Sequence, residues 1–193
     1  MTDEAFIYNL TNNQIPSKTK KLSAIVTDGT AILGFGNIGP EAGLPVMEGK
    51  SLLFKLLGDV DVVPVCIKKR KTPEQSVEAI LDLLSFYEAI NLEDFAAPEC
   101  FAIESQLSER KIMPIFHDDQ HGTAIVTLAA LINALKLTKK NYKELKVVIN
   151  GAGAAGLTIA KLLYTYGVKN MIVCDTKGTI FTGRTDNMNK MKN

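Results

Sequence analysis

This chain has few cysteines and no excess of charge of either sign, and each of these facts excludes a class of protein. The three cysteines, Cys66, Cys100 and Cys174, lie far apart, and no pair of them has the spacing of a zinc site. An odd number of separated cysteines fits reduced thiols in a cytosolic protein rather than a disulfide framework. Lysine and arginine number 22 against 21 acidic residues, so the formal net charge of +1 gives no reason to expect nucleic acid or an anionic membrane as a partner.

The first residues and the apolar runs give no pattern of a membrane or secreted protein. Residues 1–4 are acidic and do not show the basic-then-apolar order of a signal peptide. The longest apolar helix candidate, residues 124–137, is too short to span a bilayer and contains Thr127, Asn133 and Lys136. We therefore expect a cytoplasmic protein that does not bind a membrane.

At 193 residues, with 46% hydrophobic and 22% charged residues, the chain has the size and composition of one large or two small globular domains. Short apolar runs alternate with segments of helical periodicity, which predicts an α/β fold with a largely parallel sheet. We expect strands at 23–27, 62–67, 90–95 and 112–116, and helices at 45–57, 72–88 and 98–110. Pro64 cannot donate to a strand ladder and therefore favours an edge position for the second strand.

The segment from residue 29 to residue 49 is rich in glycine, which predicts tight turns rather than regular structure. The helix expected from Pro45 carries several apolar residues on one side, namely Met47, Leu52, Leu53, Leu56 and Leu57. Lys50 lies in this helix among glycines and apolar residues. Most lysines are solvated, but a partly buried lysine beside a metal can have its pKa depressed enough to act as a base.

Two pairs of carboxylates follow two of the expected strands, where open α/β sheets bind their ligands. Glu93-Asp94 and Asp118-Asp119 offer hard oxygen ligands that favour Mg²⁺ or Mn²⁺ over zinc. Adjacent acids repel each other, so such a cluster needs a cation to stay ionised. The alternative is that Glu93 and Asp94 cap the next helix and face water. We expect the histidines of the same loop, at positions 117 and 121, to be structural groups with satisfied hydrogen bonds.

The second half of the chain predicts a βαβ unit that binds a dinucleotide. A helix is expected at 123–137, followed by a strand at 145–150, a glycine loop, a helix to residue 166 and a strand at 170–175. The loop fits the G-x-G-x-x-G fingerprint with its acid at the end of the next strand. The expected cofactor-binding residues are Gly151, Gly153, Ala154, Ala155, Gly156 and Asp175. Asp175 favours NAD because a carboxylate repels a 2′-phosphate, although Lys177 could compensate. A glycine-rich turn that binds nothing is the alternative.

These segments together resemble the malic enzyme family, the metal-dependent NAD(P) oxidative decarboxylases, in its shorter bacterial form. The residues that carry the resemblance are 26–41, 44–50, 90–95, 116–124 and 150–156. The resemblance implies a malate dehydrogenase (decarboxylating) that converts L-malate to pyruvate and CO₂ with reduction of NAD or NADP. It also implies a homo-oligomer for the full-length form.

The resemblance also implies roles for individual residues. Lys50 is then the general base for the 2-hydroxyl of malate, and Glu93, Asp94 and Asp119 hold Mg²⁺ or Mn²⁺. The family's general acid is a tyrosine in an upstream Tyr-Ser/Thr-Pro-Gly segment. Tyr8 is the only upstream tyrosine here and lacks that context, so the role is not carried over to it.

We therefore expect a malic enzyme that is truncated at both ends. Residues 1–116 would form the metal-binding N-terminal domain, incomplete at its start, and residues 117–193 the Rossmann-like NAD(P) domain, incomplete at its end. The missing acid and the incomplete cofactor domain predict part of a malic enzyme rather than a chain that turns over malate alone. Three alternatives remain: a malolactic-type enzyme, a non-catalytic nucleotide- or metal-binding remnant, and a degraded frame that does not fold stably.

Overall fold

The structure, a computed structural model, describes residues 22–83, 86–189 and 191–192. Its first sheet has four strands in the order β2-β1-β3-β4, and all of its pairings are parallel. The strands are β1 (Leu22–Thr27), β2 (Asp61–Cys66), β3 (Ala89–Leu92) and β4 (Ile115–His117). The predicted α/β class with a parallel sheet is confirmed, and β2, which contains Pro64, is an edge strand as expected.

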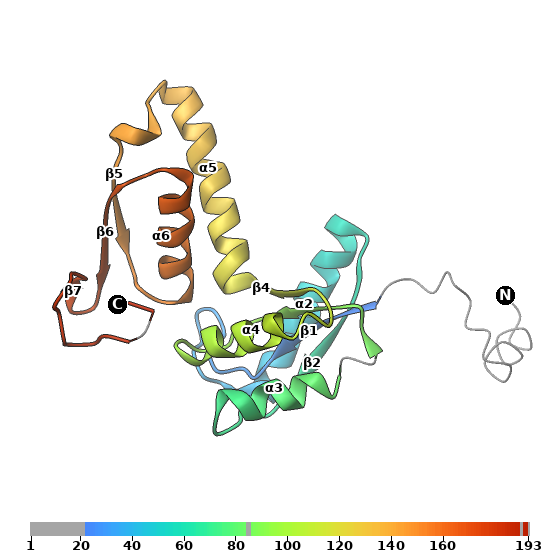
Figure 1. Ribbon diagram of the computed structural model, residues 1–193. Coiled ribbons are helices and arrows are strands. Elements are labelled where there is room, and N and C mark those ends of the chain that lie inside the picture. The colour runs from blue at the N-terminus through green and yellow to red at the C-terminus, as the bar shows by residue number, and fades with distance from the viewer. Residues whose placement is uncertain (1–21, 84–85, 190, 193) are drawn as a thin grey trace, which may run out of the picture.

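Helices cover both faces of this sheet (Figure 1). On one face, α3 (Pro73–Leu81) and α4 (Glu99–Glu109) pack against the side chains of Ala24 and Val26 and enclose the larger core cluster. On the other face, α2 (Gly39–Gly58) packs over β1 and β2 through Met47, which meets Ile25. Successive residues of β1 therefore serve opposite layers, as the twofold repeat of a strand requires.

Helix α2 differs from its prediction in where it starts and in which of its residues are buried. It begins at Gly39, inside the segment expected to be irregular, and it keeps Pro45 in its interior. The turn before it depends on Gly29, because a Cβ there would lie 2.3 Å from the backbone of Gly39. Of the apolar residues on its predicted side only Met47 is buried, while four leucines are exposed: Leu52, Leu53, Leu56 and Leu57.

A second sheet follows in the order β5-β6-β7. The βαβ unit runs as predicted from β5 (Lys146–Asn150) through α6 (Ala154–Tyr166) to β6 (Asn170–Asp175), with parallel pairing of the two strands. The antiparallel strand β7 (Gly178–Thr179) was not predicted, because two residues are too few to give a pattern. Helix α5 (Thr123–Thr138) lies beside α6 (Figure 1).

A π-helix, η2 (Asp118–Gly122), runs directly into α5 and lengthens it. The combined helix from Asp118 to Thr138 has 21 residues and is long and apolar enough, by length and composition alone, to cross a membrane. The expectation that the longest apolar helix is too short to span a bilayer is therefore wrong. Only 11% of its most apolar part is buried, and its first turn carries two carboxylates.

Candidate functional site

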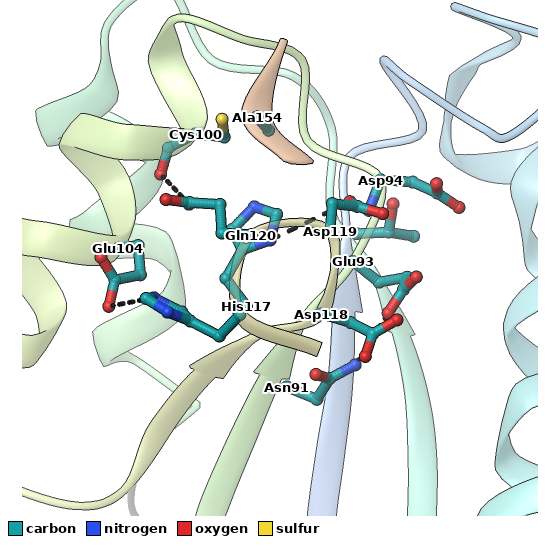
Figure 2. A network of polar contacts seen from close by, with 12 residues as sticks. Asn91, Glu93, Asp94, Cys100, Glu104, His117, Asp118, Asp119, Gln120 and Ala154 are labelled. Atoms are coloured by element: carbon teal, nitrogen blue, oxygen red, sulfur yellow. Dashed lines mark hydrogen bonds and ion pairs between the residues drawn. The ribbon is translucent and has the colours of Figure 1, made fainter. Parts of the chain in front are cut away.

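The carboxylates of Glu93, Asp94 and Asp119 gather at the carboxyl edge of the first sheet. Each offers an oxygen, and these oxygens all lie within 4.8 Å of one another. Strand β3 ends at Leu92, so its next two residues reach this edge, and the π-helix after the neighbouring β4 brings Asp119 to them. Figure 2 shows the three side chains close together at the end of the sheet.

The backbone holds this cluster in place through Asp94. Asp94 adopts a left-handed conformation with φ of 55°, and its N–H donates to Oδ2 of Asp119 at 2.9 Å. Its carbonyl accepts from the N–H of Ala31 at 2.9 Å, which ties the glycine-rich loop to the site. Thr30 adds a second tie, because its hydroxyl accepts from the N–H of Ala96 and donates to Asp28.

Burial makes the three acids reluctant to ionise without a cation. Glu93 and Asp94 are only 6% and 4% exposed, so the alternative in which they cap a helix and face water is wrong. Burial raises the pKa of Glu93 to about 7 against the opposing effect of Lys50. Burial and the charge of Asp119 raise the pKa of Asp94 to about 6, and burial also raises the pKa of Asp119. A set of hard oxygens in this state fits a divalent cation such as Mg²⁺ or Mn²⁺.

Lys50 reaches the cluster from α2. Its ammonium contacts Oε2 of Glu93 and lies 2.8 Å from Oδ2 of Asp118. Burial lowers the pKa of Lys50, but the hydrogen bonds to Asp118 and Glu93 outweigh it, so the pKa is raised overall. The expected depression of this pKa is therefore not found in this arrangement, in which Lys50 is protonated.

Sequence reasoning missed Asn91, which lies on β3 two residues before Glu93. Its Nδ2 donates to Oε2 of Glu93 at 2.9 Å, while its Oδ1 is buried and has no hydrogen-bond partner in the described part of the chain. The signal was present, since a polar amide inside an apolar strand is unusual.

The two histidines behave differently from each other. His117 is fully buried, and neither ring nitrogen has a hydrogen-bond partner among the described residues, so the expectation of a satisfied histidine is wrong for it. Burial lowers the pKa of His117 to about 4, which keeps the ring neutral near pH 7. His121 is partly exposed and lies 3.5 Å from Oε1 of Glu104.

The glycine loop between β5 and α6 has the shape of a phosphate site. Gly151 has φ of 128°, and a Cβ on Gly156 would lie 1.8 Å from the carbonyl oxygen of Gly151, so both positions require glycine. A Cβ on Gly153 would meet nothing within 4 Å, which leaves room above the start of α6. Ala154 and Ala155 open that helix, where free amides favour an anion.

A cavity of about 350 Å³ extends from this loop to Asp175. The Asp175 carboxylate accepts from Nη2 of Arg184 at 2.7 and 2.8 Å, from Nζ of Lys192 at 2.7 Å and from the amide of Asn187 at 3.0 Å. Lys177 contributes its backbone N–H at 2.8 Å. The hydrogen bonds from Lys192 and Arg184 hold the pKa of Asp175 well below its usual range. Two cations therefore share the carboxylate expected to bind the ribose.

The acidic cluster and the glycine loop adjoin each other. Ala154 and Leu157, at the start of α6, pack against the core cluster that contains Cys100 and Phe101. In Figure 2 Ala154 lies beside Cys100, whose carbonyl accepts from Gln120 of the π-helix. The start of α6, where the glycine loop ends, therefore packs against the elements that carry the carboxylates.

Comparison with known proteins identifies one family over both halves of the chain. Two family models match, the N-terminal domain of malic enzyme over residues 2–74 and its NAD binding domain over residues 120–192. The bifunctional malic/malolactic enzyme of Bacillus subtilis is 52% identical over 183 residues, which are 94% of this chain and 44% of the relative. The NADP-dependent malic enzyme of Escherichia coli is 46% identical over 173 residues, which are 89% of this chain and 23% of the relative.

Solved structures give the same result. The NAD-dependent malic enzyme of Thermotoga maritima superposes with a TM-score of 0.86 at 43% identity, over 98% of this chain and 50% of that one. The malic enzyme of Entamoeba histolytica superposes with a TM-score of 0.84 at 40% identity, over 95% of this chain and 40% of that one. The chain thus spans half or less of the length of these relatives.

Proposed function

This chain belongs to the malic enzyme family, and from that premise we propose that it carries the base, the metal ligands and the nucleotide loop of an L-malate oxidative decarboxylase. The reaction would take L-malate and NAD⁺ or NADP⁺ to pyruvate, CO₂ and the reduced nucleotide. The observation that supports it most directly is the meeting of Lys50 with Glu93 at the edge of the acidic cluster.

Glu93, Asp94 and Asp119 would hold Mg²⁺ or Mn²⁺. When bound, the cation supplies a Lewis acid that polarises the substrate oxygen and stabilises the negative charge formed as CO₂ leaves. The protein's part is to keep three buried oxygens converging and to hold them there through the Asp94 N–H.

Lys50 would act as the general base for the 2-hydroxyl of malate. Its ammonium donates a hydrogen bond to Asp118 at 2.8 Å, and the Asp118 side chain is 38% exposed, so Lys50 lies where the site opens to solvent. Lys50 would take the hydroxyl proton, and the nicotinamide, when bound, would supply the hydride acceptor.

The glycine loop would bind the pyrophosphate of the nucleotide. The amides of Ala154 and Ala155 and the open space at Gly153 supply the phosphate site, and Gly151 and Gly156 shape the turn that presents it. Asp175 would approach the ribose, with Arg184 and Lys192 on its carboxylate.

The test is malate-dependent reduction of NAD⁺ or NADP⁺ in the presence of Mn²⁺, measured on the chain alone and after addition of the flanking segments of a relative. Reduction that appears in either sample supports the proposal. Nucleotide and Mn²⁺ binding without reduction in both samples favours a non-catalytic remnant. The absence of cooperative thermal unfolding would instead favour a frame that does not fold.

A malolactic reaction is the second candidate, because the Bacillus subtilis relative is named a bifunctional malic/malolactic enzyme. Product analysis separates the two, since the malolactic reaction gives lactate without net reduction of the nucleotide.

The cytoplasmic location and the homo-oligomeric full-length form stay predictions. The free thiols of Cys66, Cys100 and Cys174 support a reducing compartment.

A further inference from the structure

We propose that Asn91 is a positioning residue for Glu93, holding one of its carboxylate oxygens so that the other is aimed at the cation. The inference rests on the proposed metal site and adds a residue to it. Asn91 itself would not touch the metal, the substrate or the nucleotide.

The described hydrogen bonds to the Glu93 carboxylate reach only one of its two oxygens. Asn91 Nδ2 donates to Oε2 at 2.9 Å from along β3, and the Lys50 ammonium contacts the same oxygen from α2. No group in the described part of the chain donates to Oε1. One oxygen of Glu93 is therefore fixed from two sides, and the other is left for a ligand that accepts a lone pair.

Asn91 is a buried amide between apolar neighbours. The residue is 7% exposed, and its register neighbours on β1 and β4 are Ile25 and Phe116. Its Oδ1 is buried without a hydrogen-bond partner in residues 22–83, 86–189 and 191–192. An unpaired buried acceptor destabilises a fold, so stability alone gives no reason for an amide at this position.

The orientation of the amide follows from Glu93. A swapped amide would place Oδ1 against Oε2, and two acceptors repel each other, so only Nδ2 pairs with the carboxylate. An outer hydrogen bond of this kind fixes the direction of a metal ligand, and its loss commonly weakens metal binding by about 10–100-fold. When Lys50 turns to the substrate hydroxyl, Asn91 would still hold Oε2.

The test is Asn91→Leu, which keeps the volume and removes the donor, with Asn91→Val as a second variant suited to a strand. Mn²⁺ binding is measured by calorimetry without substrate or nucleotide, and the thermal midpoint is measured with the metal chelated. We expect binding weakened by about 10–100-fold in both variants, with a metal-free midpoint that is unchanged or higher. Ser76→Ala is the matched control, because Ser76 is 3% exposed on α3, away from the site.

A double-mutant cycle separates positioning from general damage. If Asn91 acts through Glu93, Asn91→Leu weakens Mn²⁺ binding in the wild-type background but not in the Glu93→Gln background. Equal losses in the two backgrounds would overturn the proposal. So would unchanged Mn²⁺ binding with a lowered midpoint, or variants that fail to fold, because both results make Asn91 structural. A wild-type chain that binds no Mn²⁺ would overturn the metal site itself, and Asn91's role with it.

Discussion

Lys50 Nζ lies 2.8 Å from Oδ2 of Asp118, an ion pair that joins α2 to the π-helix before α5. The same ammonium contacts Glu93 at the end of β3. One positive charge therefore ties together three elements that are far apart in the sequence. In this arrangement Lys50 lies on one oxygen of Glu93 while the other is open to a cation, so the two positive charges would repel each other across the carboxylate.

Replacement of Lys50 by Met should separate these two effects. We expect Mn²⁺ to bind several-fold more tightly, because a nearby positive charge that repels the cation is gone. Malate-dependent nucleotide reduction should fall by about 10²–10⁴-fold, because the general base is lost. Calorimetry and a reduction assay measure the two quantities. Lys55→Met is the control, since Lys55 lies in the last turn of the same helix and pairs with Asp59 and Asp61 rather than with the acidic cluster. Weaker Mn²⁺ binding in Lys50→Met would contradict the repulsion between Lys50 and the cation.

Mn²⁺ binding should strengthen as the pH rises from about 5 to about 8. Protons compete with the cation for Glu93 and Asp94, whose pKa values are raised to about 7 and about 6. Each proton that the metal displaces contributes up to about a tenfold gain in affinity per pH unit. Calorimetry in two buffers of different ionisation enthalpy counts the protons released. Affinity that does not change across this range, with no proton release, would contradict the pKa shifts.

Glu93→Gln should remove one part of the pH dependence of the metal-free stability. The pKa of folded Glu93 is about 7 against an ordinary value of 4.5, so the folded state holds the proton more tightly than the unfolded chain. The stability of the wild type relative to Glu93→Gln is therefore highest below pH 4.5 and falls as the pH rises toward 7, by up to about 3 kcal/mol. Urea unfolding of both chains across this range measures the difference. His117 has the opposite slope but is present in both chains and cancels. A difference that grows with pH would contradict the sign.

The sequence predicted those parts of the fold that depend on local patterns. The βαβ unit and the edge position of β2 follow from apolar runs and from Pro64, and both are confirmed. The predicted start of helix α2 was Pro45, whereas the helix begins at Gly39, because glycines in a sequence suggest turns. In the structure these glycines allow close packing instead: Gly29 lies against Gly39, and Gly43 lies against Ile32.

The meeting of side chains from distant segments was harder to predict. Glu93 and Asp119 were expected at one sheet edge, because parallel strands end together, but Lys50 lies 68 residues from Asp118. No local sequence pattern indicates that Arg184 and Lys192 donate hydrogen bonds to the carboxylate of Asp175, which lies 9 and 17 residues before them. The π-helix depends on Gly122, where a Cβ would lie 2.1 Å from Oδ1 of Asp118, and no simple periodicity indicates it.

Two alanine substitutions in the glycine loop should have opposite consequences. In Gly156→Ala the new Cβ would lie 1.8 Å from the carbonyl oxygen of Gly151, so α6 must shift from β5 and the thermal midpoint should fall by several degrees. In Gly153→Ala the Cβ meets no protein atom within 4 Å and the backbone φ of −85° suits alanine, so the midpoint should be unchanged. Its methyl group would instead occupy the space of the pyrophosphate, and nucleotide binding should weaken by about tenfold or more. Scanning calorimetry and nucleotide titration measure the pair. Gly153→Ala that binds the nucleotide like the wild type would place the phosphate elsewhere.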